Sequence, residues 1–223
     1  MPALKSSRAT RRRAGVSLIE ILIATTILTI LLGSIGMIVL RGNGVFQQSL
    51  TSNDLEAQAR RIVDRILLEL MDADRSSLVL TPPAPFGAST IDYARGEGVA
   101  GGVLAVSATR RIRWRMLDTE LDDGVDNNNN GLIDEGRIEL LPNSVGAPGE
   151  VIGLGSYVRE YLEGELPDGA DNNANGVVDE RGLCMTYNAA TQTVTVRVTL
   201  ERFDPLGGLV TRTVENSAQI RND

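Results

Sequence analysis

The sequence predicts an α+β protein in which one long N-terminal helix packs on an antiparallel β-sheet. The first observation is an apolar run of 25 residues, from Val16 to Leu40. As a helix it would be roughly 37 Å long, enough to cross a hydrocarbon core of about 30 Å. Apolar residues at helical spacing follow this run, and the C-terminal part alternates apolar and polar residues with the period of a strand.

Residues 1–15 form a basic leader without acidic residues. Its charged side chains are Lys5, Arg8, Arg11, Arg12 and Arg13. Positive charge before a span is typical of the cytoplasmic side, so we expect a single-pass inner-membrane protein whose C-terminal domain is periplasmic or extracellular. Beyond the leader, 17 basic residues against 29 acidic ones leave a formal charge of −12. This balance argues against nucleic-acid binding, which depends on neutralising phosphates.

Glu20 is the only charge inside the apolar run, and Gly15 lies directly before it. A carboxylate at the centre of a membrane helix costs about 2.5–3.5 kcal/mol, so Glu20 suggests a function. A secretory signal peptide has an apolar core of only about 7–15 residues and an Ala-x-Ala-like site, which this sequence lacks after Leu40. An ordinary single-span anchor explains the leader charges and the run, but neither Gly15 nor Glu20.

The basic leader, the glycine, and the apolar segment with glutamate in its fifth position resemble the prepilin signal of type IV filament proteins. This resemblance implies cleavage between Gly15 and Val16 by a prepilin peptidase, followed by N-methylation of Val16. It also implies an assembly role for Glu20, because the carboxylate could pair with the α-amine of Val16 and set the register between neighbouring subunits. The family usually has Phe or Met at the position of Val16.

The helix is predicted to run from about Ser17 to about Asp74, with a transmembrane half over 16–40 and an amphipathic half over 41–75. Its apolar stripe consists of Leu55, Ala59, Ile62, Val63, Ile66, Leu67 and Leu70. Two helices with a break near Gly44 are the alternative. The proline-rich segment Thr81–Pro85 prevents any continuation.

Residues 76–223 are predicted to form an exported β-rich domain. Alternation is strongest over 111–116 and 192–200, and a turn at 204–208 leads to a last strand over 209–220, which predicts a terminal antiparallel hairpin. Weaker strand candidates are 103–107, 138–141, 157–161 and 183–187. The glycine-rich segment Gly96–Gly102 lacks the lysine of a phosphate loop and is predicted to be a flexible connection.

The helical segment 54–75 and the closing residues 211–223 are similar to the larger minor pilins. The similarity is greatest to the J-type minor pseudopilin of type II secretion and its counterpart in pili. It implies a structural subunit that assembles with other pilin or pseudopilin subunits into a filament.

Two Asp/Asn-rich segments, 122–136 and 167–182, repeat with a period of 45 residues. Oxygen-bearing side chains at alternate positions, followed by a glycine, suit calcium, which takes 6–8 oxygen ligands. We therefore predict two calcium sites. The predicted ligands are Asp123, Asp126, Asn128, Asn130, Asp134 and Glu135 in the first segment, and Asp168, Asp171, Asn173, Asn175, Asp179 and Glu180 in the second.

These segments are not EF-hands, because the twelfth positions counted from Asp126 and Asp171 are Arg137 and Gly182 instead of glutamate. The alternative is a pair of plain hairpin turns, for which Asp-Gly and Asn-Gly are well suited. Two copies with the same spacing, and the mutual repulsion of the carboxylates in each, favour calcium.

The composition argues against an enzyme. The chain has no histidine and one cysteine, Cys184, so the usual zinc sites and the Ser-His-Asp or Cys-His triads cannot be built. The sequence therefore predicts a non-enzymatic minor pilin or pseudopilin stabilised by calcium. The alternative is a membrane-anchored calcium-binding or adhesive surface protein that does not polymerise.

Overall fold

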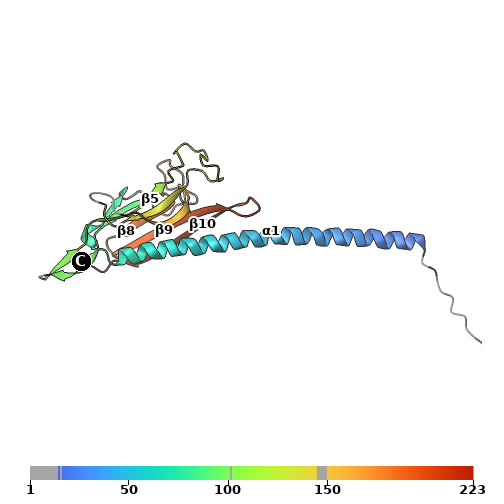
Figure 1. The fold of residues 1–223 in the computed structure, drawn as a ribbon, viewed down its shortest axis with the longest axis horizontal. Helices are drawn as coiled ribbons and strands as arrows, with labels where there is room; N and C mark the ends of the chain where they lie inside the picture. Colours follow the sequence, from blue (N-terminus) through green and yellow to red (C-terminus); the bar gives the residue numbers. More distant parts are fainter. Residues whose placement is uncertain (1–14, 16, 101, 145–149, 223) are drawn as a thin grey trace, which may run out of the picture. The chain divides into compact units, whose positions relative to one another are not determined.

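The protein consists of one long helix and an antiparallel sheet, as predicted (Figure 1). The computed structural model describes residues 15, 17–100, 102–144 and 150–222. The leader residues 1–14 and the predicted methylation site Val16 lie outside the described residues. The chain divides into two compact units, 1–45 and 46–223, which are described separately.

Helix α1 runs from Leu18 to Met71 and is helical through Gly44, so the prediction of one helix is confirmed and a break there is excluded. Its apolar half exposes its large hydrophobic side chains. The hydroxyls of this half donate to backbone carbonyls in the preceding turn at 2.8–3.0 Å; they belong to Thr25, Thr26, Thr29 and Ser34. Polar groups satisfied within the helix are compatible with a lipid environment, where water cannot satisfy them.

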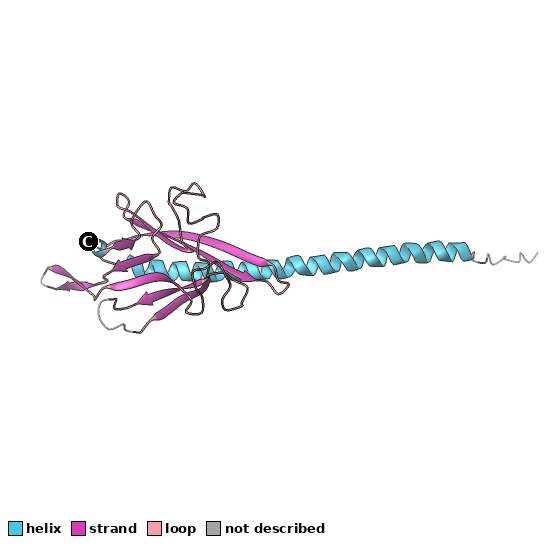
Figure 2. Cartoon of the chain, turned by 90° about the horizontal axis from the view of Figure 1, so that it is seen from above, coloured by secondary structure: helices cyan, strands magenta, loops and turns pink. Residues whose placement is uncertain are grey.

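The C-terminal half of α1 buries the predicted stripe. All seven residues of the stripe, from Leu55 to Leu70, are buried, and all belong to the hydrophobic core. Figure 2 shows the strands lying over this half of the helix. Because the polar face of an amphipathic helix remains in water, the stripe alone decides which side of the helix meets the sheet.

Eight strands form the main sheet in the order β1–β2–β5–β6–β7–β9–β10, with β8 also paired to β9. A separate two-stranded sheet consists of β3 and β4. The strands are β1 (Val79–Thr81), β2 (Thr90–Tyr93), β3 (Gly96–Ala100), β4 (Val103–Val106), β5 (Arg110–Met116), β6 (Gly136–Leu141), β7 (Ile152–Val158), β8 (Leu183–Asn188), β9 (Thr193–Phe203) and β10 (Leu209–Gln219). A short 3₁₀ turn, η1 (Arg75–Ser77), follows the helix.

The predicted terminal hairpin is confirmed: β9 and β10 pair antiparallel along their full length. The alternating residues Val194, Val196, Val198 and Leu200 of β9 are all buried in the core. Polar contacts join the hairpin to the helix, since Arg202 binds Asp54 and Arg212 donates to Ser52, both at 2.7 Å. The hairpin therefore contributes both apolar packing and polar contacts to the helix–sheet interface.

The prediction of a flexible connection at Gly96–Gly102 is wrong, because Gly96–Ala100 forms β3 and pairs with β4. Gly98 has a φ of 117° and lies where the pairing register shifts, as in a β-bulge. The backbone ladder needs no side chains, so a glycine-rich strand gives no alternating pattern from which it could be predicted.

The predicted strand over 157–161 is also misplaced. The strand is β7, Ile152–Val158, and its regular geometry ends near Tyr157, whose φ is 62°. Beyond it, Tyr161 makes only an isolated bridge to Arg181. β7 crosses close to α1 at Gly155, where an added Cβ would overlap the end of Ile62.

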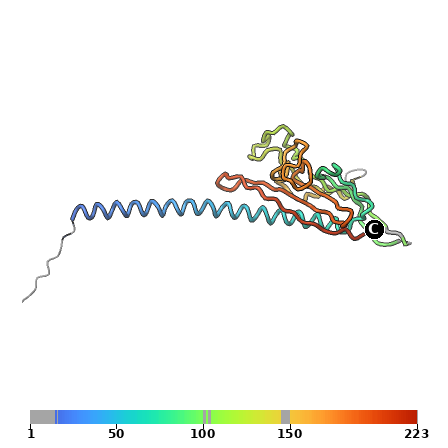
Figure 3. Tube along the Cα trace, turned by 180° about the vertical axis from the view of Figure 1, so that it is seen from behind, coloured from blue at the N-terminus to red at the C-terminus, as the bar shows by residue number. Residues whose placement is uncertain are grey.

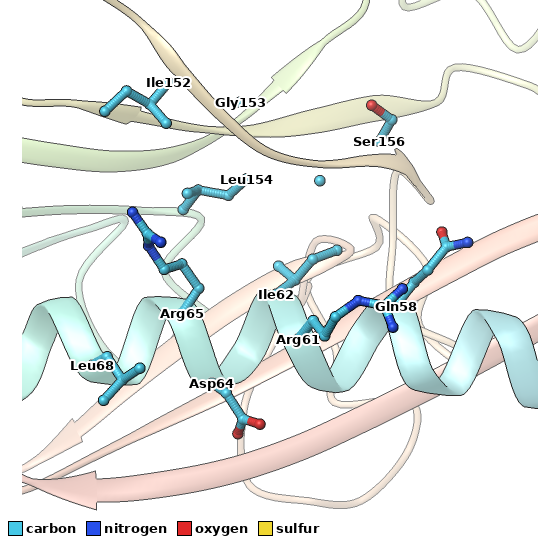
Figure 4. Close-up of a pocket in the computed structure, with 11 residues that line it drawn as sticks. Gln58, Arg61, Ile62, Asp64, Arg65, Leu68, Ile152, Gly153, Leu154 and Ser156 are labelled. Atoms are coloured by element: carbon cyan, nitrogen blue, oxygen red, sulfur yellow. The ribbon is translucent and has the colours of Figure 1, made fainter.

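A groove of about 620 Å³ lies between α1 and β7 and includes this crossing. In Figure 4, Arg61, Ile62 and Arg65 extend from the helix, and Leu154 extends from the strand.

We expect Gly155→Ala to destabilise the domain by about 1–3 kcal/mol, because the new methyl group must displace Ile62 from the core. Gly153→Ala, two residues earlier in the same strand, is the matched control, since nothing lies within 4 Å of its added Cβ. It should be neutral or slightly stabilising. Chemical denaturation of the two variants measures the difference. Equal stabilities would mean that β7 does not cross the helix at Gly155.

Candidate functional site

The two acidic segments have the same backbone conformation. The first acidic loop (122–136) lies between β5 and β6, and the second acidic loop (167–182) lies between β7 and β8. Left-handed φ values recur at positions 45 residues apart: Gly124 and Gly169, Asn129 and Ala174, Gly131 and Gly176, Asp134 and Asp179. The repeat seen in the sequence is therefore a repeat in three dimensions, and Figure 3 shows the two loops together at one end of the sheet.

In the first loop, Asp126 accepts hydrogen bonds from the backbone N–H groups of Asn130 at 3.2 Å and Gly131 at 2.7 Å. Asn128 and Asn130 each accept from the N–H two residues further along. These bonds bend the chain so that the side chains of Asp126, Asn128 and Asn130 face the inside of one turn. We call these three residues, together with Glu135, the first cradle.

Glu135 closes the first cradle. The amide nitrogens of Asn128 and Asn130 lie 2.9 and 2.5 Å from its Oε1 atom. The other oxygen, Oε2, is buried and has no hydrogen-bond partner among the described residues. An unpartnered oxygen on a fully buried carboxylate is costly, and a cation in the cradle would provide the missing interaction. The donor set, two carboxylates and two amides, fits calcium.

The second loop repeats this arrangement with Asp171, Asn173, Asn175 and Glu180, the second cradle. It differs in one respect. A guanidinium nitrogen of Arg197 lies 2.7 Å from Oε1 of Glu180. The closing carboxylate of the second cradle therefore already has a cationic partner, and that of the first cradle has none among the described residues.

The remaining predicted ligands lie at the turn preceding each cradle. Asp123 and Asp168 cap the turns that they begin, accepting from the N–H of Val125 and Ala170. Asp134 accepts from the N–H of Gly124, and Asp179 from that of Gly169. The structure thus separates the twelve predicted residues into two cradles of four and four turn-capping aspartates.

Two glutamates that the sequence interpretation missed support the cradles. Glu120 accepts from the N–H groups of Asn127 and Asn128, and Glu165 accepts from that of Asn173. They are themselves 45 residues apart, each followed by a leucine, so extending the repeat by a few residues would have found them. Burial, together with repulsion from Glu180 and Asp171, raises the pKa of Glu165, which its bond from Asn173 only partly opposes.

Among the described residues, several buried acids in and around the loops lack the ion-pair partners that the buried Glu139 of β6 has. Glu139 lies 2.9 Å from Arg113, 2.6 Å from Arg137 and 3.8 Å from Arg115. Burial alone would raise its pKa, but Arg113 and Arg137 hold the pKa below the usual value. The buried loop acids without an ion-pair partner among the described residues are Glu120, Asp134, Glu135 and Glu165. Because buried charges are normally paired, an ion from solution is the expected partner.

Cys184 is a buried free thiol in β8. Burial and the neighbouring Glu180 raise its pKa, so the thiol is protonated at neutral pH. A protonated buried thiol is unsuited to disulfide exchange.

At the N-terminus, Glu20 lies in the first turn of α1. Its Oε2 atom lies 3.4 Å from the backbone nitrogen of Ser17, three residues earlier. A glutamate at the third helical residue that reaches back to the N–H of the residue before the helix forms one half of a capping box. The carboxylate also lies at the positive end of the helix dipole, which lowers the cost of its charge. The structure thus gives Glu20 a local role in starting the helix.

One family model matches the chain, that of the prokaryotic N-terminal methylation motif, over residues 10–36. The match includes Gly15, Glu20 and most of the apolar run. The chain carries a type IV prepilin-like signal. The comparisons with curated proteins and with solved structures gave no match.

The prepilin-like signal continues into a helix that is long and apolar enough to cross a membrane. None of its most apolar stretch is buried within the protein. Together the signal and the helix are consistent with a membrane-anchored, single-pass protein.

Proposed function

We propose that this protein is a minor pilin or pseudopilin, a structural subunit of a type IV filament or of a type II secretion pseudopilus. The observation that carries the proposal is the methylation motif over residues 10–36, which runs directly into α1. The antiparallel sheet packed on the C-terminal half of α1 supports it, as does the similarity of 54–75 to the J-type minor pseudopilin. In this role the protein acts by assembly and not by catalysis.

The proposed pathway begins with insertion of α1 into the inner membrane, leader in the cytoplasm and sheet domain outside. A prepilin peptidase then cuts between Gly15 and Val16, and Val16 is methylated. Removal of the leader places the new α-amine one residue before Ser17, whose N–H the Glu20 carboxylate already faces. The partners are the peptidase and the other pilin or pseudopilin subunits.

We further propose that both acidic loops bind calcium in the sheet domain outside the cytoplasm. The buried Oε2 atom of Glu135 supports this part of the proposal, as do the buried acids around the cradles that have no ion-pair partner in the described part of the chain. Calcium would act as a structural ion that neutralises the loops and holds them on the sheet.

The role of Glu20 in assembly can be separated from its role in the capping box. Glu20→Gln keeps a hydrogen-bonding side chain for the N–H of Ser17 but removes the charge, whereas Glu20→Val removes both. We expect both variants to be inserted and cleaved normally and to be strongly depleted from sheared filaments. The measurement is the ratio of variant in the filament fraction to variant in the membrane fraction.

Incorporation of Glu20→Gln at the native level would show that capping, and not charge pairing, is what Glu20 supplies. Native incorporation of both variants would contradict the role of Glu20 in assembly. Absence of the native chain itself from the filament fraction would instead favour a membrane-anchored protein that does not polymerise.

A further inference from the structure

Three carboxylates from separate segments meet between the two acidic loops. Asp122 and Asp134 belong to the first loop, and Glu160 lies just after β7 at the base of the second. One oxygen of each carboxylate lies within 4.8 Å of one oxygen of the others. Asp122 and Glu160 belong to neither cradle.

The cluster contains a buried oxygen that lacks a partner. Asp134 is 3 % exposed; its Oδ2 accepts from the N–H of Gly124, but its Oδ1 has no hydrogen-bond partner among the described residues. Leaving such an atom unsatisfied is costly, and more so for a charged group. A ligand bound among the three carboxylates would satisfy it.

We infer that Asp122, Asp134 and Glu160 bind a third divalent cation, separate from the two cradles, and that this cation joins the first acidic loop to the base of the second. The inference concerns the sheet domain alone and does not depend on filament assembly.

The spacing favours calcium over magnesium. Calcium binds oxygen at 2.3–2.6 Å, so two ligands on opposite sides of the ion lie up to about 5 Å apart. Magnesium binds at about 2.0–2.1 Å and requires its ligands to be no more than about 4.2 Å apart in near-octahedral geometry. A separation of up to 4.8 Å accepts calcium without a rearrangement of the backbone. Water can complete the coordination, because Asp122 is exposed.

One internal cation, Arg181, lies near the cluster. Its guanidinium is 3.5 Å from Glu160 and stacks over the rings of Trp114 and Tyr161, which hold it at the side of the cluster. The three carboxylates and the one guanidinium carry a net charge of −2. One divalent cation would neutralise this charge.

Two of the three residues in the cluster lie at positions where the 45-residue repeat is not conserved between its two copies. The counterpart of Asp122 in the second loop is Pro167, and the counterpart of Glu160 before the first loop is Arg115. The second loop therefore cannot form the same cluster, and only one such site is expected.

The proposed ion lies beside a cavity that separates the loops. This cavity of about 300 Å³ is lined by Glu160, by 131–133 of the first loop and by 165–167 around the start of the second. Few direct contacts can cross such a space, so a bridging cation would determine how the loops face each other.

Calcium stoichiometry of the full chain in detergent tests the inference. We expect equilibrium dialysis to give three ions per chain for the native protein. Glu160→Gln and Asp122→Asn should each give one fewer. Glu163→Gln is the matched control, because it removes the same charge from an exposed residue three positions away and should leave the count unchanged.

The loop sites and the bridging site can fail independently. The double variant Asp126→Asn, Asp171→Asn should lose the two cradle ions and keep the bridging ion. If the cradles bind no calcium, the native chain should bind one ion, and Glu160→Gln should abolish that binding. The inference is overturned if Glu160→Gln and Asp122→Asn both bind as many ions as the native chain. Asp122 is exposed, so loss of folding would not explain a change in that variant.

Discussion

Adding calcium to the full chain in detergent should raise the unfolding temperature of the sheet domain by roughly 10–20 °C. A ligand that binds only the folded state stabilises it by about 2.7 kcal/mol at a hundredfold excess over Kd. Two cradle ions contribute about twice that, and each kcal/mol corresponds to roughly 2–4 °C in a domain of this size. Magnesium should have a far smaller effect because it requires stricter octahedral geometry. Thermal unfolding followed by circular dichroism measures the shift.

The calcium-dependent part of the shift is the relevant quantity, because Asp126 and Asp171 also cap backbone N–H groups. Asp126→Asn and Asp171→Asn should each remove part of it. The loss should be larger for Asp126→Asn, since Arg197 already partly neutralises the second cradle through Glu180. Asp204→Asn, at a turn-capping aspartate outside the loops, is the control and should retain the full shift. If calcium does not change the unfolding temperature of the native chain, both loops are plain hairpin turns without a bound ion.

The second large effect concerns processing. Gly15→Leu should leave the chain at full length in the membrane, because the peptidase must approach the backbone closely at the cleaved bond. Among the described residues, nothing lies within 4 Å of a Cβ added at Gly15, so the substitution creates no clash with them. Intact mass of the membrane fraction measures the result.

Gly33→Leu is the matched control for processing. It also adds a leucine where nothing lies within 4 Å, but inside the apolar run, and it should be cut normally. If Gly15→Leu is still trimmed to Val16, the assignment of the cleavage site is wrong.

The helix and the terminal hairpin could be predicted from the sequence because their burial follows a simple period. Leu55 and Leu70 belong to one stripe of a 3.6-residue repeat, and Val194 and Leu200 belong to one face of a two-residue repeat. Both patterns can be recognised within one short segment, and the residues that they predict to be buried are the ones that the fold buries.

The strands that were missed lack such a pattern. β1 and β2 have only three and four residues, too few to show a period. β3 contains Gly96 and Gly98, and β7 contains Gly153 and Gly155, so neither alternates in hydrophobicity. These strands are defined by backbone pairing with their neighbours, which sequence periodicity does not report.

The residues of the candidate sites also fall into those that the sequence pattern predicts and those that only the fold brings together. The cradle residues Asp126, Asn128 and Asn130 lie within one short turn, so their spacing alone brought them together. Glu160 is separated by many residues from Asp122 and Asp134, and Arg197 comes to Glu180 from a neighbouring strand. Only the fold places these groups together, and the sequence contained no signal for them.

The central claim, that the protein is a processed subunit of a type IV filament, is tested most directly by the intact mass of the native chain recovered from sheared filaments. We predict a chain that begins at Val16, lacks residues 1–15 and carries a methylated N-terminal amine. Recovery of the protein only from membranes, with residues 1–15 still attached, would contradict the claim.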